Sequence, residues 1–504
     1  MSDDPLIAGL DVGTGSVKAM VFDPRGGVMS SSSVPTPTRR PRAGWAEHDP
    51  QELWSAAAEA LREAVGQLDE PARVASVAVA SMAEAGVPLD AHGEPVADVI
   101  AWFDRRSVEQ GRQLEEAVGA DRLAEVAGLR PQPIYGLCKL MWLEQNEPDA
   151  YSRMRAWLNV ADFVAFRLCG EQATDFSLAT RTAALDLREL CWSEELLSGT
   201  AVSHSLMPPL SWSGTRLGTL TREAAEETGL HTDAVVATGG HDHICGALAA
   251  GVLDPGRALD SMGTAESILV PLTELADPAE PAQQGHSCGA HVVRDRYYIS
   301  GGVHAAGASV DWVLELAGGE RDERLTEASA VPPGAHGASF LPLLRAEAGE
   351  VVERGVLMGL TPELGRAELV RAVHEGLAFA FRHALDAVAS HAGLDEPPEV
   401  RAIGGGARNQ LLLELKATVL GRPLHRLEVE EATCLGAALL GAVGADLYED
   451  AAKAAVGLEL EAEEIHPHSD QVAGYQARFE ELLGRDYPDL RAVSRALEEL
   501  ADEA

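Results

Sequence analysis

The chain has 504 residues, of which 46% are hydrophobic, enough for two or three domains that each bury a core. Its formal net charge of −39 makes nucleic acid and anionic membrane surfaces unfavourable partners. The six scattered cysteines form no Cys-x-x-Cys pair, and no apolar run approaches the ~20 residues of a membrane span. The acidic N-terminus is unlike a signal peptide, so we expect a cytoplasmic protein.

Two apolar segments near the N-terminus, residues 6–11 and 17–23, predict strands joined by a tight turn. The backbone N–H and hydroxyl groups of such a turn can face a phosphate, and Asp11 is placed to hold a hydrated Mg²⁺. Glycine-rich hairpins are common, so the turn alone is weak support. Its residues are Gly13, Thr14, Gly15 and Ser16.

Carboxylates follow two further predicted strands in the N-terminal half. Glu84 comes after the strand predicted at residues 74–80, and Asp104 comes after the apolar segment 99–103. Carboxylates at strand ends can accept hydrogen bonds from sugar or polyol hydroxyls, although a single one is more often a solvated turn residue. Together with Asp242 they predict a polar substrate pocket.

Asp242 lies where a buried strand, residues 234–237, gives way to a helix at 244–250. A carboxylate at such a turn is held by free N–H groups, and it can serve as a general base or merely cap the helix. His241 and His243 flank Asp242 and offer metal ligands. Because alternate residues of an extended chain point to opposite faces, we do not predict a metal site there.

Residues 259–267 repeat the Leu-Asp, Gly-Thr and Ser elements of the first hairpin, which indicates two related domains. The tips of the two hairpins, with Gly263 and Thr264 in the second, would grip a nucleoside triphosphate in a shared cleft that Asp242 faces. Two later stretches of small residues predict close approach to the same nucleotide. They contain Gly307 in the first, and Gly405, Gly406 and Asn409 in the second.

The second of these stretches, residues 404–409, lies between a predicted strand and a helix from Gln410, and we assign it to the adenosine part of the nucleotide. A dinucleotide-binding fold is the competing interpretation, but the Gly-x-Gly-x-x-Gly spacing is not met. We also expect a charged surface loop at 345–354 and an acidic, helical tail from Ala451 that packs outside.

Taken in order, these motifs resemble the FGGY family of carbohydrate kinases over residues 6–445, with features of xylulokinases and glycerol kinases. The resemblance implies an α/β protein with two ribonuclease-H-like domains of the actin, hexokinase and Hsp70 superfamily and an active site in the cleft between them. It divides the chain into an N-terminal domain, a C-terminal domain and a helical tail. Their ranges are 1–250, 251–445 and 446–504.

By this resemblance Asp242 is the catalytic aspartate that deprotonates the attacking hydroxyl of a sugar or polyol, with ATP as donor and Mg²⁺ as cofactor. Lys18, with the amides of the two hairpin tips, would stabilise the developing charge. Glu84, Asp104, Asp242 and His243 are the expected substrate contacts.

The resemblance extends to two groups of kinases with different substrates. Glycerol kinases carry Gln-Arg-Glu where this chain has Met82, Ala83 and Glu84, and xylulokinases carry Met-His at the last two positions. We favour a ketose, such as the pentuloses xylulose and ribulose, with a small polyol as the alternative. A sugar-independent ATPase and an idle sugar-binding protein are further alternatives. A homodimer is left open.

Overall fold

The computed structural model describes residues 4–263, 265–275, 277–303, 306–342, 355–429 and 431–482. The chain forms two compact units that alternate along the sequence. The first contains residues 1–254, 271–299 and 431–460, and the second contains residues 255–270, 300–430 and 461–504. The chain contains two large mixed β-sheets with helices against them, so the protein is α/β as predicted.

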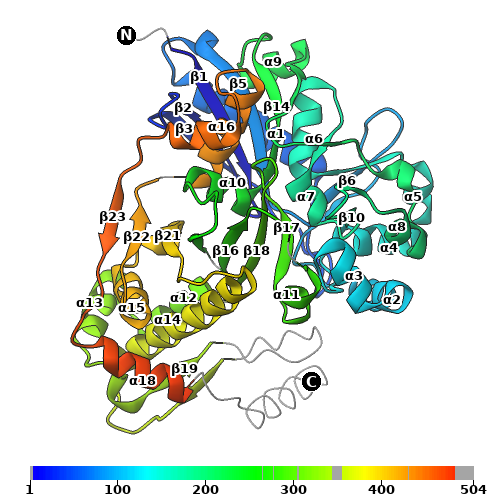
Figure 1. The fold of residues 1–504 in the computed structure, drawn as a ribbon. Helices are drawn as coiled ribbons and strands as arrows, with labels where there is room; N and C mark the ends of the chain where they lie inside the picture. Colours follow the sequence, from blue (N-terminus) through cyan, green and yellow to red (C-terminus); the bar gives the residue numbers. More distant parts are fainter. Residues whose placement is uncertain are drawn as a thin grey trace. The chain divides into compact units, whose positions relative to one another are not determined.

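The sheet of the first unit has six strands in the order β13-β14-β5-β1-β2-β3 (Figure 1). Strand β1 pairs with β2 in antiparallel fashion and with β5 in parallel, and β14 extends the parallel part. The strands span Leu6–Val12 (β1), Ser16–Phe22 (β2), Val28–Pro35 (β3), Val74–Ser81 (β5), Arg216–Thr219 (β13) and Val235–His241 (β14).

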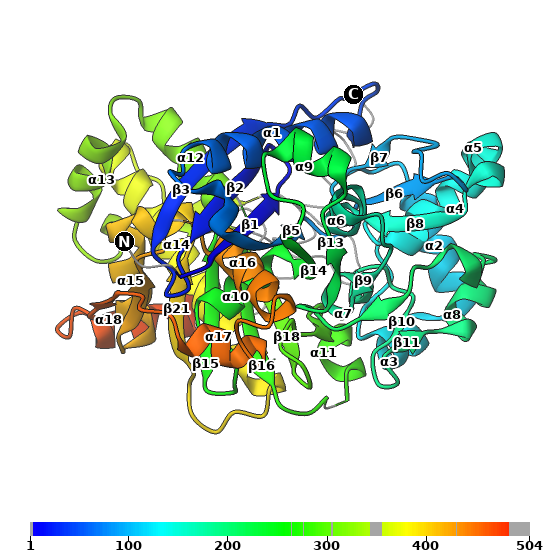
Figure 2. The ribbon, with the colours of Figure 1, turned by 90° about the horizontal axis from the view of Figure 1, so that it is seen from above.

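Helices cover both faces of this sheet, as Figure 2 shows from above. Helices α1 (Pro50–Gly66) and α6 (Val160–Cys169) pack on one face, and α16 (Ala432–Gly444) packs against β1, β5 and β14 on the other. Gly9 permits the close packing of α16, since a Cβ atom at this position would lie 1.9 Å from the carbonyl oxygen of Cys434. Helix α16 therefore joins the first unit despite its late place in the sequence.

Smaller elements surround this layer in the first unit. The helices are α2 (Val108–Val118), α3 (Ala120–Ala127), α4 (Gly136–Asn146), α5 (Pro148–Arg153), α7 (Phe176–Thr180), α8 (Glu194–Gly199), α9 (Arg222–Thr228), α10 (Asp242–Ala249), α11 (Ala279–Gln283) and α17 (Ala451–Val456). The short strands are β4 (Glu47–His48), β6 (Gly86–Leu89), β7 (Val99–Ile100), β8 (Ala156–Asn159), β9 (Thr174–Asp175), β10 (Leu185–Asp186), β11 (Cys191–Trp192) and β12 (Leu210–Ser211).

The second large sheet repeats the pairing of the first. Its order is β17-β18-β16-β15-β21-β22-β23, in which β15 is antiparallel to β16 and parallel to β21, and β22 extends the parallel part. The strands span Arg257–Met262 (β15), Glu266–Leu272 (β16), Ser287–Ala290 (β17), Tyr297–Val303 (β18), Glu399–Ile403 (β21), Leu424–Leu427 (β22) and Ala462–Ile465 (β23). This shared pairing agrees with the internal repeat predicted from the sequence.

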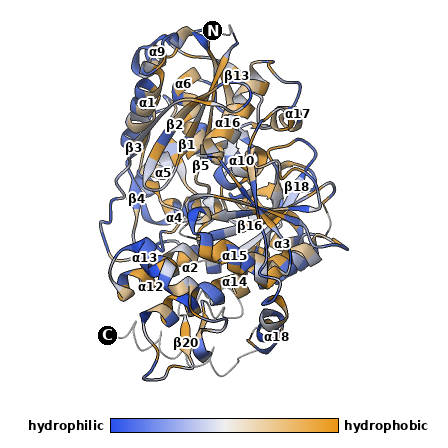
Figure 3. Cartoon of the chain, turned by 90° about the vertical axis from the view of Figure 1, so that its left-hand side faces the viewer, coloured by the Kyte–Doolittle hydropathy of each residue, from blue (hydrophilic) through white to orange (hydrophobic). Residues whose placement is uncertain are grey.

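The helices of the second unit are α12 (Ala306–Ala317), α13 (Arg321–Ser329), α14 (Arg366–His391), α15 (Gln410–Leu420) and α18 (Val472–Leu482), beside the hairpin of β19 (Ser339–Leu341) and β20 (Val356–Met358). The long helix α14 packs against α12, α13 and α15. Figure 3 shows that hydrophobic colour is concentrated on elements such as α16, whereas α13 is largely hydrophilic. The predicted loop at 345–354 lies outside the described residues.

The predicted division of the chain at residues 250 and 445 is linear and stays a prediction, whereas the compact units alternate along the sequence. Residues 271–299 and 431–460 belong to the first unit, so part of the predicted second domain and the start of the predicted tail join it. The reason is that α16 and α17 complete the layer on the first sheet, and β23 extends the second. Within the described residues, every helix is too short or too polar to span a bilayer.

Candidate active site

Asp242 is the first residue of α10, directly after β14. Gly239 permits a close approach of this strand to its neighbour β5, since a Cβ at this position would lie 1.8 Å from the carbonyl oxygen of Val79. The helix-cap alternative is not realised, since His241 occupies the N-cap position. The carboxylate Oδ1 of Asp242 instead accepts the backbone N–H of His243 at 2.6 Å.

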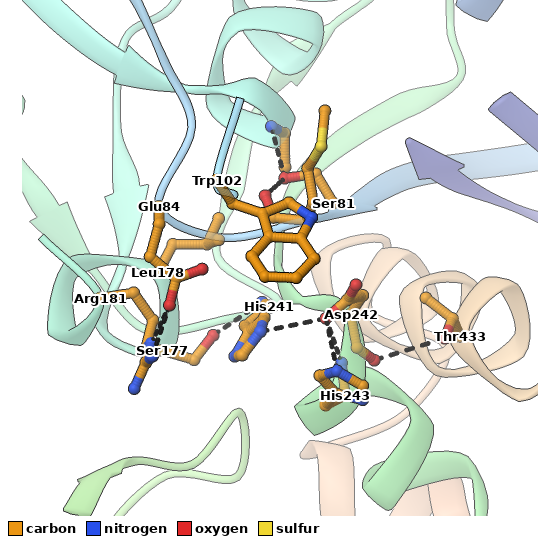
Figure 4. A network of polar contacts seen from close by, with 12 residues as sticks. Ser81, Glu84, Trp102, Ser177, Leu178, Arg181, His241, Asp242, His243 and Thr433 are labelled. Atoms are coloured by element: carbon orange, nitrogen blue, oxygen red, sulfur yellow. Dashed lines mark hydrogen bonds and ion pairs between the residues drawn. The ribbon is translucent and has the colours of Figure 1, made fainter. Parts of the chain in front are cut away.

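The two histidines converge on Asp242, which Figure 4 draws between them. Nε2 of His241 lies 3.0 Å and Nε2 of His243 lies 4.0 Å from Oδ1 of Asp242. The argument that alternate residues point apart was wrong here, because the chain turns from strand to helix at this point. One ligand atom from each of the three residues lies within 4.8 Å of the others, a spacing that could hold a metal ion.

The two histidines also control the acidity of the carboxyl group. Burial raises the pKa of Asp242, but the interactions with His243 and His241 outweigh it and hold this pKa well below its ordinary range. Burial lowers the pKa of His243. Asp242 is therefore an ionised hydrogen-bond acceptor at neutral pH.

Hydrogen bonds from two other elements fix this turn. The backbone N–H of His241 donates to Oγ of Ser177 at 2.9 Å, and that hydroxyl donates to Oδ2 of Asp175 at 2.7 Å. On the other side, Oγ1 of Thr433 donates to the carbonyl oxygen of Asp242 at 3.4 Å (Figure 4). These contacts hold the Asp242 backbone between the start of α7 and the start of α16.

Glu84 pairs with an arginine that the sequence interpretation did not select. Its Oε1 lies 2.5 Å from Nη2 of Arg181, and both side chains are largely buried. Arg181 also lies over the ring of Tyr135, with 5.2 Å between the guanidinium carbon and the ring centre. Glu84 has a φ of 57°, a strained conformation of the kind that gathers at functional sites.

Lys139 supports the backbone next to Glu84. Its ammonium group is fully buried and donates to the carbonyl oxygens of Glu84, Ile100 and Ala101. Burial lowers the pKa of Lys139 to about 7. The lysine thereby fixes the two loops that carry Glu84 and Trp102.

Asp104 is fully engaged within the protein. Oδ1 accepts the backbone N–H of Arg106 at 2.7 Å and its Nε at 2.9 Å, and Oδ2 accepts Nη2 of Arg106 at 2.8 Å and the backbone N–H of Ala46. The residue is 1% exposed. Strand β7 ends at Ile100, so Asp104 stands in a turn and not at a strand end. Its role as a substrate contact stays a prediction, with little hydrogen-bonding capacity left for a sugar.

The first hairpin tip combines free and occupied polar groups. Nε1 of Trp102 donates to Oγ1 of Thr14 at 3.0 Å, and Nζ of Lys18 contacts Oε1 of Glu431 at 2.7 Å. Oδ1 of Asp11 is buried without a hydrogen-bond partner in the described part of the chain. The turn bond runs from the N–H of Gly13 to the carbonyl of Ser16, and a Cβ at Gly15 would meet nothing within 4 Å.

The second unit contains a cavity of about 240 Å³. Five of the predicted nucleotide-binding residues line it, although they come from three separate segments; they are Gly263, Gly307, Gly405, Gly406 and Asn409. Thr264 lies outside the described residues. Asn409 also caps α15, since its Oδ1 accepts the N–H of Leu412 at 3.2 Å.

The sequence interpretation did not select three charged residues near Glu84 and near the cavity, namely Arg181, Glu266 and Lys416. Arg181 approaches Glu84 from 97 residues away, and Lys416 approaches Asp260 from 156 residues away. Local spacing carries no signal for such pairs.

Comparison with known proteins identifies the family. The model of the FGGY family of carbohydrate kinases, N-terminal domain, matches residues 6–249, and the model of its C-terminal domain matches residues 258–445. The chain therefore belongs to the FGGY family of carbohydrate kinases. It is a sugar kinase, a phosphotransferase, and kinases of this family use ATP as the donor.

Individual relatives agree with this assignment. The chain is 30% identical over 499 residues to a xylulose kinase of Bacillus subtilis, covering 97% of this chain and 98% of the relative. A glycerol kinase of Thermococcus kodakarensis is 28% identical over 456 residues, covering 89% of this chain and 90% of that protein. The crystal structure of xylulose kinase from Rhodospirillum rubrum superimposes with a TM-score of 0.84 at 28% identity, covering 98% of this chain and 99% of that one. The fold is thus the actin-like ATPase fold that the sequence resemblance implied.

Proposed function

We propose that this kinase transfers the γ-phosphate of ATP to a hydroxyl group of a ketose, with a pentulose such as xylulose or ribulose as the expected substrate. The observation that carries the proposal is Asp242, an ionised carboxylate held at the start of α10 between two histidines. The similarity to xylulose kinases over nearly the whole chain supports a ketose. A small polyol is the second candidate, supported by the glycerol kinase relatives and by the carboxylate at Glu84.

Asp242 would accept a hydrogen bond from the attacking hydroxyl and take its proton as the bond to phosphorus forms. A carboxylate with a lowered pKa is a weak base, so proton transfer would follow most of the bond change at phosphorus. His241 keeps the carboxylate in one orientation through its contact at 3.0 Å. Catalysis in this class of reaction rests on such positioning more than on covalent chemistry.

Asp11 fits the Mg²⁺ predicted from the sequence. Its Oδ1 is buried without a partner among the described residues, and burial together with the charge of Asp242 raises the pKa of Asp11 to about 7. A buried carboxylate in this condition is stabilised by a cation. A bound Mg²⁺ would supply positive charge next to the transferred phosphate.

Glu84 and Arg181 are the proposed polar contacts for the sugar hydroxyls. The carboxylate of Glu84 accepts hydrogen bonds and the guanidinium of Arg181 donates them, so the pair can bind a vicinal diol. His243 would add a further polar contact on the other side of Asp242. Gly405, Gly406 and Asn409 are proposed to bind the adenosine of ATP, with Gly307 in the same cavity and Gly263 at the phosphates.

The test is ADP release with Mg-ATP across a panel of pentuloses, hexuloses, tetritols, pentitols and glycerol, for the wild type and for Asp242→Asn. The matched control is Asp233→Asn, because Asp233 is an exposed carboxylate in the loop before the same strand β14. One compound should stimulate turnover, and Asp242→Asn should lower kcat by about 100-fold or more. Asp233→Asn should leave kcat within a factor of about two.

Equal ATP hydrolysis with and without any sugar would favour the sugar-independent ATPase and refute the proposal. Stimulation only by glycerol or a tetritol would replace the ketose by the polyol candidate. If a ketose stimulates both proteins equally, the kinase activity stands but Asp242 is not the base.

A further inference from the structure

Asp242 and the two histidines beside it form a cluster of side chains that commonly bind metal ions. Nε2 of His241 lies 3.0 Å and Nε2 of His243 lies 4.0 Å from Oδ1 of Asp242. Among the residues that the structure describes, no other three histidine, cysteine or carboxylate side chains come together at this spacing. The proposed reaction requires only the carboxylate as a base, so two imidazoles that converge on the same oxygen allow a second role.

The separations between the ligand atoms suit a bound transition-metal ion. Zinc binds histidine nitrogen and carboxylate oxygen at about 2.0–2.2 Å, so two ligands of a tetrahedral ion stand about 3.4 Å apart. The two distances to Oδ1 of Asp242, 3.0 and 4.0 Å, lie on either side of that value. Small rotations of the two imidazole rings would therefore bring all three ligand atoms to one ion.

An ion in solution can reach these side chains, which also start from a fixed backbone. The side chains of His241, Asp242 and His243 are 13%, 25% and 41% exposed. Figure 4 draws the carboxylate between the two rings. The backbone of the turn is held by Ser177, which accepts the N–H of His241 at 2.9 Å, and by Thr433, which donates to the carbonyl oxygen of Asp242 at 3.4 Å. Three protein ligands leave one position of a tetrahedral ion for water.

The donor set favours ions of the zinc class over magnesium. Two imidazole nitrogens and one carboxylate oxygen suit zinc and similar transition-metal ions, whereas Mg²⁺ prefers oxygen ligands in octahedral geometry. Asp11, the proposed Mg²⁺ ligand, offers oxygen alone. The chain thus presents different donor sets to the two kinds of ion.

We infer that His241, Asp242 and His243 form an inhibitory site for a divalent transition-metal ion of the zinc class. A carboxylate oxygen that is bound to such an ion no longer accepts the proton of the attacking hydroxyl. The ion therefore competes with the sugar for Asp242 and stops phosphate transfer. The inhibitory effect rests on the proposed function, because it requires Asp242 to be the base, whereas binding of the ion does not.

The first experiment measures Zn²⁺ affinity without ATP, by competition with a chromophoric chelator, for the wild type, His241→Gln and His243→Gln. The matched control is His231→Gln, because His231 lies 3.3 Å from Asp233 in an exposed pair to which the described residues add no third ligand. Each ligand variant should bind Zn²⁺ at least about 10-fold more weakly, and the control should change the affinity by less than about twofold. An excess of Mg²⁺ should not displace Zn²⁺ from the wild type.

The second experiment measures initial rates with the stimulating sugar at free Zn²⁺ concentrations that a metal buffer sets. Saturating Zn²⁺ should lower wild-type turnover by about 100-fold, the loss expected for Asp242→Asn, and at intermediate Zn²⁺ more sugar should restore the rate. Each histidine variant, compared with its own rate without Zn²⁺, should need at least about 10-fold more free Zn²⁺ for half inhibition. Thermal unfolding without metal checks that the variants are folded.

Wild-type Zn²⁺ affinity in either folded histidine variant would overturn the three-residue site, and so would displacement of Zn²⁺ by Mg²⁺. Zn²⁺ binding that depends on both histidines but leaves wild-type turnover unchanged would overturn the inhibitory role. Failure of every sugar to stimulate turnover would instead overturn the proposed function, while the affinities measured without ATP would still decide whether the metal site exists.

Discussion

The two hairpins β1–β2 and β15–β16 have the same backbone plan but different contacts with lysine. Each has a parallel neighbour beside its first strand, and each carries an aspartate, Asp11 or Asp260, at the same place in a Leu-Asp pair. In the first hairpin Oδ1 of Asp11 is buried without a hydrogen-bond partner among the described residues, and the nearby Lys18 contacts Glu431. In the second, Lys416 contacts both Asp260 and Glu266 in the interior.

The contrast shows how a duplicated element can be adapted to two tasks. A carboxylate without an internal cation is costly to keep, and a site for an external cation justifies that cost. A carboxylate that contacts a buried lysine is a structural anchor. The fold repeats because backbone pairing repeats, whereas the charges differ because they come from residues far away in the sequence.

The largest expected effect comes from removing the internal cation. Lys416→Met leaves Asp260 and Glu266 buried without a counter-charge and should lower the free energy of unfolding by about 3–5 kcal/mol. Lys18→Met is the matched control, because Lys18 and Glu431 are each about a third exposed and should contribute at most about 1 kcal/mol. Urea denaturation measures both. Equal losses in the two variants would contradict the contrast between the hairpins.

Asp11→Asn should break the first hairpin's function while leaving its fold intact. We expect kcat to fall by about 100-fold and the Mg²⁺ concentration for half-maximal activity to rise about 10-fold, since the carboxylate is the proposed ligand. Initial rates at varied free Mg²⁺ measure both quantities. An unchanged Mg²⁺ dependence, with turnover close to the wild type, would remove Asp11 from the metal site.

The excess charge of the second hairpin should appear as a pH dependence of stability. Because the folded pKa of Glu266 is raised to about 7, the native state keeps a proton that the unfolded chain loses above about pH 4.5. Stability is therefore lost as pH rises between these values, and Glu266→Gln lacks that loss. From pH 5 to 8 the variant should gain about 2 kcal/mol relative to the wild type, as measured by urea denaturation at each pH. A constant difference would show that Lys416 neutralises Glu266 fully.

Much of the fold could be predicted from the sequence because its signals are local. The glycine-rich hairpin, the strand before Asp242 and the small-residue turn before α15 each depend on neighbours within about ten residues. The repeated Leu-Asp and Gly-Thr elements predicted the duplication that the two sheets display. The interleaving of the units was not predicted, since it depends on where α16 packs.

The candidate site was predictable only in part. Asp242 and the cavity glycines follow from motifs, whereas Arg181, Lys139 and Glu266 act through partners distant in sequence. Asp104 shows that a contact with a near neighbour in the sequence can also be missed. Its position after an apolar segment suggested a free carboxylate, yet Arg106, only two residues away, occupies both oxygens.

The smallest expected effect tests whether the two hairpin tips have the same backbone conformation. A Cβ at Gly13 would lie 3.3 Å from the carbonyl oxygen of Ser16, and one at Gly263 would lie 3.2 Å from that of Ala265. Neither glycine has a positive φ, so alanine at either position should cost about 0.5 kcal/mol, the tight contact being partly offset by a less flexible unfolded chain. Urea midpoints compare the two variants.

Gly404→Ala provides the scale for this comparison. Gly404 has a φ of 90°, and its Cβ would lie 2.7 Å from the carbonyl oxygen of Met262, so alanine there should cost about 2 kcal/mol or more. A loss of that size at only one of the two tips would mean that the hairpins differ in backbone as well as in charge. Equal small losses would place their whole divergence in the side chains around Asp11 and Asp260.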